Sequence, residues 1–440
     1  MTYCLTDTIY ALSSGPGKGG VAVIRVSGRL VKDVLHRLAG LDQPTPRHAY
    51  FRPLRDAAGQ VLDNALVLFF PGPFSFTGED VAELQVHGGR AVIQGVFRAL
   101  SDIDGCRPAE RGEYSRRAVI NGKMDLTAAE GLLDMIDAET EHQRAQAYQQ
   151  MQGHLGRLYD GWRTDLTRDM AYLEAFIDFP EEDIPPEKIS EIETKTRALI
   201  AAIQAHLDDN RRGERLRDGF QIAIIGQPNV GKSSLINALT RRDVAIVSQT
   251  AGTTRDVVEA HLDVDGFPVI IADTAGLREQ VGEVEREGIR RAVQRAEQAD
   301  LILHIQDGTA YPAGDTLPAT LSGKTILTVW NKADLMPSLP SDALCISART
   351  GAGLDTLWQR IRTILTRDFV SRDSAVITRE RYRVALTECV RHLTCSLSAP
   401  ALELQAEDLR LAARALGRIT GRIDAEDLLD VIFRDFCIGK

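Results

Sequence analysis

The sequence predicts a multidomain α/β and α+β protein, built from an N-terminal α+β domain, a discontinuous all-α helical domain and an inserted P-loop domain. Three observations predict this class. The first 120 residues mix short β-rich runs with turns, helical periodicity starts near residue 122 and returns after 375, and strands alternate with helices from about 220 to 370. We expect the strands in this last part to form a parallel sheet covered on both faces. The expected boundaries are 1–120 for the N-terminal domain, 121–217 and 373–440 for the two helical parts, and 218–372 for the P-loop domain.

The N-terminal part shows the alternation of strands and turns that is typical of a small α+β domain. Residues 21–24 and 65–70 are apolar runs, and we expect strands there. The segments 15–20 and 71–73 are rich in glycine and proline, so we expect loops at these places.

Two long apolar stripes follow the N-terminal part. In residues 155–177, apolar side chains recur every three or four positions, which predicts one long amphipathic helix. Phe179 is followed by Pro180, so this helix should end there. A second stripe with the same spacing runs over 189–207. We expect both helices to pack against other helices.

Composition and charge exclude several classes of protein. Hydrophobic residues make up 44% of the chain and charged residues 26%, as in soluble globular proteins. We find no segment suited to cross a bilayer and no signal peptide, so we expect a cytoplasmic protein. The six cysteines lack metal-type spacing and are expected to stay reduced. Because the formal net charge is −10, a nucleic-acid partner requires a local basic patch.

Residues 226–233 match the phosphate-binding pattern GxxxxGK[ST]. They follow a predicted strand over 220–225 and open a predicted helix over 234–240, as such a loop requires. The glycines let backbone N–H groups converge on phosphate oxygens, and the helix N-terminus adds positive potential. We expect Lys232 to reach the β- and γ-phosphates and Ser233 to bind Mg²⁺.

Three further motifs complete the pattern of a Ras-like P-loop G domain. Asp273 begins Asp-Thr-Ala-Gly and is placed to hold Mg²⁺ through water. Asp334 ends Asn-Lys-Ala-Asp and can accept hydrogen bonds from N1–H and the amino group of guanine, a donor pair that adenine lacks. Ser347 begins Ser-Ala-Arg, whose backbone N–H groups suit the guanine O6. The strands that precede these motifs are expected over 268–271, 325–329 and 343–346.

The gap between the first two motifs contains a candidate switch segment. Residues 250–256 read Thr-Ala-Gly-Thr-Thr-Arg-Asp, and Thr254 is the threonine we expect to complete the Mg²⁺ shell. Leu277 stands where many GTPases place a glutamine that orients the attacking water, and leucine cannot orient water. Either hydrolysis is slow or another polar group replaces glutamine. The candidates for that group are Glu279, Glu283, Glu285 and Glu287.

Positive charge near the β- and γ-phosphates has two possible sources. Arg255 and Arg278 lie in the right region for an arginine finger, but neither position is specific. A monovalent cation is the other source, and Asn229 offers it an oxygen ligand. The residues expected to contact GTP are Asn229, Val230, Gly231, Lys232, Ser233, Ser234, Ser248, Gln249, Thr250, Ala251, Gly252, Thr253, Thr254, Asp273, Thr274, Ala275, Gly276, Asn331, Lys332, Ala333, Asp334, Ser347, Ala348 and Arg349.

A second pattern lies outside the GTPase motifs. Its segments are 17–20 (Gly-Lys-Gly-Gly) with Arg25, 76–80 (Phe-Thr-Gly-Glu-Asp), 87–89 (His-Gly-Gly), 107–113 (Arg-Pro-Ala-Glu-Arg-Gly-Glu), 121–126 (Asn-Gly-Lys-Met-Asp-Leu) and 437–440 (Cys-Ile-Gly-Lys). With these segments the whole chain resembles the bacterial tRNA-modifying GTPases of the MnmE or TrmE type, in the TrmE-Era-like GTPase family. The terminal tetrapeptide together with a central G domain is highly specific to that family.

The resemblance implies an architecture, a reaction and partners. The N-terminal domain is expected to bind a folate one-carbon donor, 5,10-methylenetetrahydrofolate or its 5-formyl analogue, and to form a homodimer. A partner of the MnmG type, which carries FAD, is expected to complete a heterotetramer. Together they are expected to add an aminomethyl or carboxymethylaminomethyl group to C5 of the wobble uridine of certain tRNAs.

The resemblance also assigns residues. Arg25, Glu83, Lys123 and Lys440 match the folate contacts, and Asn229, Ser248, Thr250 and Thr253 match the positions that hold K⁺ when two G domains pair. Glu285 matches the glutamate that positions water, which offers a physical answer to Leu277. Cys437 is either a nucleophile towards the uracil ring or a small packed side chain.

Two other readings of the chain remain open. In the first, the chain is a regulatory or ribosome-assembly GTPase that binds RNA and modifies nothing. In the second, it is a degenerate G domain that serves as a dimerisation scaffold. Folate binding separates the first from a modification enzyme, because an assembly factor has no use for Arg25 and Lys440 as a pair. The intact Lys232, Asp273 and Asp334 argue against the second.

Overall fold

The structure is a computed structural model, and it divides into two compact units. One unit comprises Met1–Leu133, Met151–Thr167 and Ala413–Lys440, and the other comprises Asp134–Gln150 and Arg168–Ala412. The described residues are 6–15, 17–179, 187–240, 259–272, 293–369, 375–423, 429, 432–433 and 436–439.

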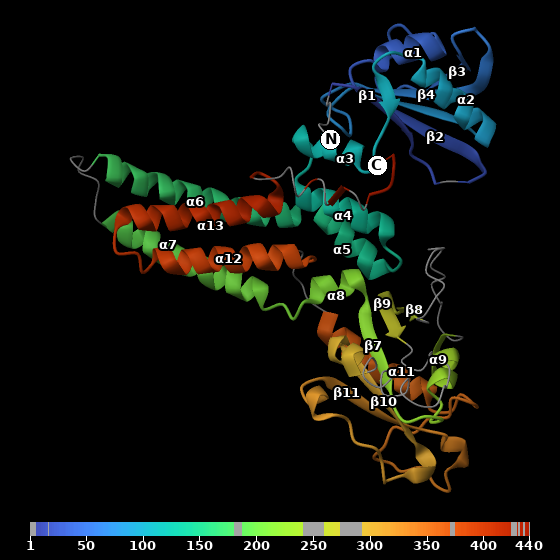
Figure 1. The fold of residues 1–440 in the computed structure, drawn as a ribbon, viewed down its shortest axis with the longest axis vertical. Coiled ribbons are helices and arrows are strands. Elements are labelled where there is room, and N and C mark those ends of the chain that lie inside the picture. Colours follow the sequence, from blue (N-terminus) through green and yellow to red (C-terminus); the bar gives the residue numbers. More distant parts are fainter. Residues whose placement is uncertain are drawn as a thin grey trace, which may run out of the picture. The chain divides into compact units, whose positions relative to one another are not determined.

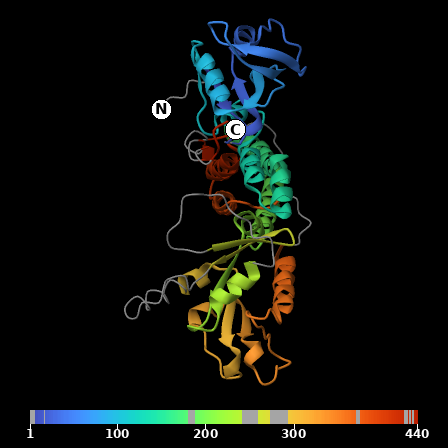
Figure 2. The same ribbon diagram turned by 90° about the vertical axis from the view of Figure 1, so that its right-hand side faces the viewer.

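A six-stranded sheet forms the core of the first unit (blue in Figure 2). Its strand order is β3-β4-β5-β2-β1-β6, and every pair is antiparallel except β1 with β6. The strands are β1 (Thr8–Leu12), β2 (Gly19–Ser27), β3 (Tyr50–Arg55), β4 (Val61–Phe70), β5 (Val81–Gly88) and β6 (Cys106–Pro108), and the helices are α1 (Val31–Ala39), α2 (Arg90–Ser101) and α3 (Glu113–Ile120). Apolar side chains of α1 and α2 pack on the sheet in one core. The strands predicted over 21–24 and 65–70 are confirmed as parts of β2 and β4.

Five strands in the second unit form a mixed sheet with the order β11-β10-β7-β9-β8. They are β7 (Phe220–Ile225), β8 (Glu259–Val264), β9 (Phe267–Ala272), β10 (Leu301–Asp307) and β11 (Thr325–Asn331), and two helices, α9 (Lys232–Thr240) and α11 (Leu354–Phe369), share the apolar core on one face. The other face is covered by helical residues 293–298.

Two expectations for this sheet are wrong. The sheet is not wholly parallel, because a short turn joins β8 to β9 as an antiparallel hairpin, and a hairpin is too short for a parallel crossover. The strand expected over 343–346 is only a bridge of Cys345 to Trp330, since Ser347 already turns into the following loop. The strands predicted over 220–225, 268–271 and 325–329 are confirmed.

Helices account for most of the remaining described residues (Figure 1). They are α4 (Leu126–Asp137), α5 (Glu141–Met151), α6 (His154–Asp178), α7 (Glu187–Leu207), α8 (Arg212–Asp218), α12 (Glu380–Ser396) and α13 (Leu402–Thr420). The two predicted stripes are confirmed as α6 and α7, with Leu173 and Ile203 fully buried. None of the helices in the described part of the chain combines the length and apolar character needed to cross a membrane.

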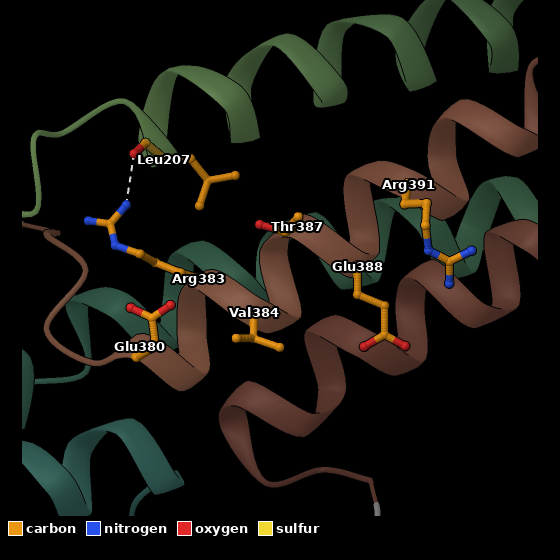
Figure 3. A pocket seen from close by; sticks show the side chains of 7 residues that line it. All are labelled: Leu207, Glu380, Arg383, Val384, Thr387, Glu388 and Arg391. Carbon is orange, nitrogen blue, oxygen red and sulfur yellow. Dashed lines mark hydrogen bonds between the residues drawn. The ribbon is translucent and has the colours of Figure 1, made fainter.

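Segments before and after the five-stranded sheet contact each other within the second unit. Gln150 of α5 accepts a hydrogen bond from Thr378 (2.9 Å) and donates one to Tyr382 of α12 (3.4 Å). The helices α7 and α12 lie side by side. Figure 3 shows the end of this contact, where Arg383 donates to the Leu207 carbonyl at 2.8 Å beside a shallow hollow. The helical segments therefore share a core although the sheet separates them in sequence.

Candidate functional site

The phosphate loop connects β7 to α9. Gly226 begins it so close to β10 that a Cβ atom there would lie 2.2 Å from the Ile305 carbonyl oxygen, which only glycine avoids. Asn229 and Gly231 have φ angles of 63° and 95°, in the left-handed region. These two turns curl the loop ahead of the helix, the geometry in which successive backbone N–H groups face one anion.

Lys232 is the first residue of α9, and its ammonium lies over the loop. Nζ donates to the carbonyl oxygens of Gly226 and Gln227, both at 2.8 Å. Ser233 and Ser234 are exposed in the first turn of α9, while Val230 is buried in the core of the sheet. The loop is thus anchored by one apolar side chain and presents a cation and two hydroxyl groups to solvent.

Asn331 joins the phosphate loop to the two segments expected to recognise guanine. Its side chain is 3% exposed; Nδ2 donates to the Val230 carbonyl at 2.7 Å, and Oδ1 accepts from the Ala348 backbone N–H at 3.0 Å. A further backbone bond runs from Ala333 N–H to the Ile346 carbonyl at 2.9 Å. The sequence suggested Asn331 as a nucleotide contact; the structure shows it as the bridge between three loops.

We expect Asn331→Ala to destabilise this site rather than simply remove one contact. The buried Val230 carbonyl and Ala348 N–H would both lose their partner, at a cost of about 2–4 kcal/mol in the free energy of unfolding. Urea unfolding followed by tryptophan fluorescence checks the stability, and calorimetry with GDP checks the accompanying loss of affinity. Asn237→Ala, at an exposed position of α9, is the matched control. Equal stability of the two variants would contradict the bridging role.

Asp334 presents its carboxylate at the end of the same loop. Oδ1 accepts from the Ser347 hydroxyl at 2.6 Å, and Oδ2 pairs with Arg349 Nη2 at 2.7 Å. The Ser347 hydrogen bond, together with the charge of Arg349, lowers the pKa of Asp334. The carboxylate is therefore ionised at neutral pH and acts only as a hydrogen-bond acceptor, as recognition of guanine N1–H and its amino group requires.

Several predicted site residues lie outside the described residues. They are Ser248, Gln249, Thr250, Ala251, Gly252, Thr253, Thr254, Arg255, Asp273, Thr274, Ala275, Gly276, Leu277, Arg278, Glu279, Glu283, Glu285, Glu287 and Lys440. The strands on either side are described: β8 begins at Glu259 and β9 ends at Ala272. The predicted roles of the switch residues stay predictions.

In the first unit, Arg25 and Glu83 face each other across β2 and β5 and form a salt bridge of 3.0 Å. The Arg25 guanidinium also lies over two aromatic rings, 5.5 Å from the centre of Phe76 and 5.8 Å from that of Tyr114. The resemblance assigned Arg25 and Glu83 to the folate site but did not assign Tyr114. Tyr114 follows the motif 107–113 directly and lies outside all the quoted motifs. The strand register and α3 bring these groups together.

A buried ion cluster fixes the loop that carries Phe76. The Arg117 side chain is fully buried and donates to Glu79 at 3.0 Å and to Glu113 at 2.9 Å. Glu113 also pairs with Arg107 at 2.7 Å, and these hydrogen bonds hold the pKa of Glu113 below its usual value despite burial. Since each buried charge has an opposite partner, the cluster locks the loop before β5 onto α3.

The remaining predicted residues of this unit lie near the same sheet. Lys123 donates from Nζ to the Pro73 carbonyl at 2.8 Å, and Cys437 is exposed. Gly439 accepts a hydrogen bond from the Ser13 hydroxyl at 2.9 Å, which places the terminal segment beside the end of β1. In β1, Ala11 is the residue that pairs with Arg25 of β2.

The phosphate loop, the ionised carboxylate of Asp334 and the Asn331 side chain that joins their loops are typical of the P-loop proteins that bind guanine nucleotides. Comparison with known proteins agrees. The sequence profile "GTP-binding protein TrmE N-terminus" matches residues 8–123, and the profile "MnmE helical domain" matches residues 126–437.

Close relatives extend the match to the whole chain. The "tRNA modification GTPase MnmE" of Paramagnetospirillum magneticum is 51% identical over 442 residues, covering 99% of this chain and 100% of the relative. That of Parvibaculum lavamentivorans is 52% identical over 440 residues, with the same coverage. The human mitochondrial "5-taurinomethyluridine-[tRNA] synthase subunit GTPB3" is 48% identical over 459 residues, covering 98% of this chain and 93% of the relative. The chain belongs to the MnmE family of tRNA modification GTPases: it is a GTP hydrolase with a TrmE N-terminal domain, a helical domain and a P-loop GTPase domain.

Proposed function

We propose that the chain hydrolyses GTP to drive modification of the wobble uridine of certain tRNAs. The observation that carries the GTP site is Asn331, whose amide fixes the phosphate loop and the guanine-reading loops in one arrangement. Lys232 and the loop amides bind the β- and γ-phosphates, and Asp334 reads the base. A fixed distance between these two parts selects guanosine triphosphate over nucleotides that satisfy only one of them.

Two metal ions are proposed at this site. The hydroxyl of Ser233 at the start of α9 is a hard oxygen donor, which suits Mg²⁺, with Thr254 and Asp273 completing its surroundings. Asn229 is exposed in the loop and, with Ser248, Thr250 and Thr253, suits K⁺. When bound, the ions neutralise charge that develops between the β- and γ-phosphates. Glu285 holds the attacking water in place of the glutamine that Leu277 replaces.

We predict that K⁺ raises the rate of GTP hydrolysis by at least about fivefold over Na⁺. The two ions carry the same charge, but only an ion of the size that the oxygen ligands accommodate places this charge at the transition state. Asp273→Ala and Glu285→Ala should strongly reduce the K⁺-stimulated rate. Phosphate release at matched ionic strength measures these effects. Glu297→Ala, at an exposed glutamate in residues 293–298, is the control and should retain the wild-type rate. Equal rates in K⁺ and Na⁺ would refute the cation assignment.

The proposed domain layout is an N-terminal domain over 1–120, a discontinuous helical domain over 121–217 and 373–440, and an inserted Ras-like G domain over 218–372. The bond between Gln150 and Thr378 supports the discontinuous helical domain, because it joins the helical segments across the insertion.

We also propose a tetrahydrofolate site in the N-terminal domain. Glu83 accepts from the pterin nitrogens, and Arg25, its salt-bridge partner at 3.0 Å, lies at the same end of the ligand. Lys440 supplies a cation for the glutamate tail, and Lys123 lies by the loop before β5. Gly439 accepts from Ser13 at the end of β1, the strand that pairs with β2, and this contact of the residue before Lys440 supports the assignment. The Arg25 guanidinium lies over both the Phe76 ring and the Tyr114 ring, and these contacts favour its present position.

Arg25→Met is expected to weaken binding of 5-formyltetrahydrofolate at least about tenfold, because a charged hydrogen bond is lost while the aliphatic stem is kept. Calorimetry with the purified protein measures the affinity. Arg98→Gln, at an exposed position of α2, is the control. An Arg25→Met affinity equal to that of the wild type would remove Arg25 from the site.

The proposed partners are tRNA, a second copy of the chain and an FAD-carrying protein of the MnmG type, in the cytoplasm. Cys437 is exposed, so it is accessible for the proposed chemistry on the uracil ring. Mass spectrometry of wobble nucleosides from cells lacking the protein tests the function. Unmodified uridine is the expected result, and a normal nucleoside profile would favour a regulatory GTPase.

A further inference from the structure

Asp307 ends β10 directly beside the guanine-reading loop. The strands β10 and β11 run parallel, and Asp307 is the register partner of Asn331, the residue before Lys332. No sequence motif marked Asp307, because its contact with Lys332 depends on β10 being the neighbour of β11.

The Asp307 carboxylate is held at both oxygen atoms. Oδ1 accepts from the Thr309 backbone N–H at 3.0 Å and from the Thr309 hydroxyl at 2.7 Å, so Asp307 caps the short 3-10 helix Gly308–Ala310. Oδ2 accepts from Lys332 Nζ at 2.7 Å. The Lys332 hydrogen bond lowers the pKa of Asp307, which is therefore ionised at neutral pH. The carboxylate is a fixed negative charge that the lysine approaches.

The backbone near Lys332 is shaped to this contact. Lys332 has φ 64° and ψ 35°, a left-handed conformation that is unusual for a residue with a side chain. A Cβ atom on Gly308 would lie 2.5 Å from the Asn331 carbonyl oxygen, so only glycine lets the turn after β10 pack this closely. The turn after β10 and the guanine-reading loop therefore form one packed unit, with the ion pair of Asp307 and Lys332 across it.

Lys332 also has a competing acceptor two residues along the chain. The Asp334 carboxylate is ionised and already attracts one cation, Arg349. A lysine ammonium on its flexible four-carbon stem reaches such a neighbour when nothing else holds it. Each Asp334 oxygen already accepts one bond, Oδ1 from Ser347 and Oδ2 from Arg349, so each keeps about one further acceptor site. An ion pair of Lys332 with Asp334 would take up this remaining capacity, which guanine requires.

We propose that Asp307 is a positioning residue for guanine recognition: it holds the Lys332 ammonium at the end of β10 and so keeps the Asp334 carboxylate available to the base. The proposal rests on the proposed roles of Lys332 and Asp334 in nucleotide binding. Asp307 acts through Lys332, without contact to the nucleotide.

The test is Asp307→Asn, which keeps the size of the side chain and the acceptor for Thr309 but removes the charge. KM for GTP should rise about tenfold while kcat at saturation stays within about twofold of the wild type. In a Lys332→Met background, where the stem is kept and the ammonium is gone, Asp307→Asn should have no further effect on KM. In an Asp334→Asn background with xanthosine triphosphate as substrate, it should also have none, because there is no carboxylate to protect.

Asp265→Asn is the matched control, since Asp265 is an exposed aspartate in the turn between β8 and β9 that pairs with Arg362 at 3.0 Å, outside the site. An unchanged KM in Asp307→Asn overturns the proposal. So does the same rise in KM in the Lys332→Met background, because the aspartate would then act through its turn. Failure of the proposed base recognition appears separately, as wild-type protein that does not distinguish GTP from ATP.

Discussion

Asp334→Asn is expected to convert the protein from a guanosine to a xanthosine nucleotide enzyme. The Asp334 carboxylate offers two acceptors, whereas the amide offers one acceptor and one donor. Guanine then meets its own amino group with an N–H group, while xanthine, which has a carbonyl oxygen at that position, finds a partner. A site built to hydrogen-bond a base discriminates strongly against the mismatch, so KM for GTP should rise at least about a hundredfold.

Steady-state hydrolysis of GTP and xanthosine triphosphate measures the change, and the ratio of the two kcat/KM values is the readout. Asp342→Asn is the control; Asp342 accepts a hydrogen bond from the Tyr311 hydroxyl at 3.1 Å and is not among the predicted nucleotide contacts. A variant that still prefers GTP would show that Asp334 does not read the base, whatever else it stabilises.

Lys232→Ala should abolish most of the hydrolysis. The Lys232 ammonium is already fixed over the loop by the carbonyl groups of Gly226 and Gln227, so it meets the phosphates without reorganisation. Losing this charge should lower kcat/KM by about a hundredfold to a thousandfold, since a preorganised group that stabilises transition-state charge contributes on that scale. The fold should survive, because the alanine retains the helical position.

Single-turnover hydrolysis at saturating protein separates the loss of chemistry from the loss of affinity. Lys324→Ala is the control, because Lys324 also donates from Nζ to a backbone carbonyl, that of Ala299 at 3.2 Å, but lies directly before β11, outside the phosphate loop. Wild-type turnover in Lys232→Ala would contradict the role of the phosphate loop.

Local pattern predicted the elements that carry the nucleotide site. The glycine-rich loop after a β-rich run at 220–225, and the Asn-Lys-Ala-Asp segment after 325–329, are both where the sequence places them. The sequence reveals these motifs because short backbone turns and single side chains, which lie close together along the chain, provide the nucleotide-binding groups. The long helices were equally accessible, since α6 and α7 each carry a continuous apolar stripe.

The sequence did not predict the contacts that depend on which strands are neighbours in a sheet. The direction of β8, the pairing of Arg25 with Glu83 and the position of Asp307 beside Asn331 all follow from the order and register of strands. An apolar run reveals a strand but not its partner. The buried ion pair of Arg117 with Glu113 was missed for a different reason: its i,i+4 spacing within α3 is local, but charged residues of these types are ordinarily at the surface.

The packing of α7 on α12 has a consequence for how the chain is made. During translation, α7 leaves the ribosome before α12, the helix against which it packs, and Ile192 and Ile203 of α7 are buried in the finished protein. All five strands from β7 to β11 are synthesised before α12 arrives to pack against it. Because domains fold as units while synthesis proceeds, the sheet can be complete while its helical host is still half-built. A nascent chain that stops before α12 can therefore contain the complete five-stranded sheet while α7 still lacks α12 as its packing partner. Apolar surface exposed in this way is what chaperones bind.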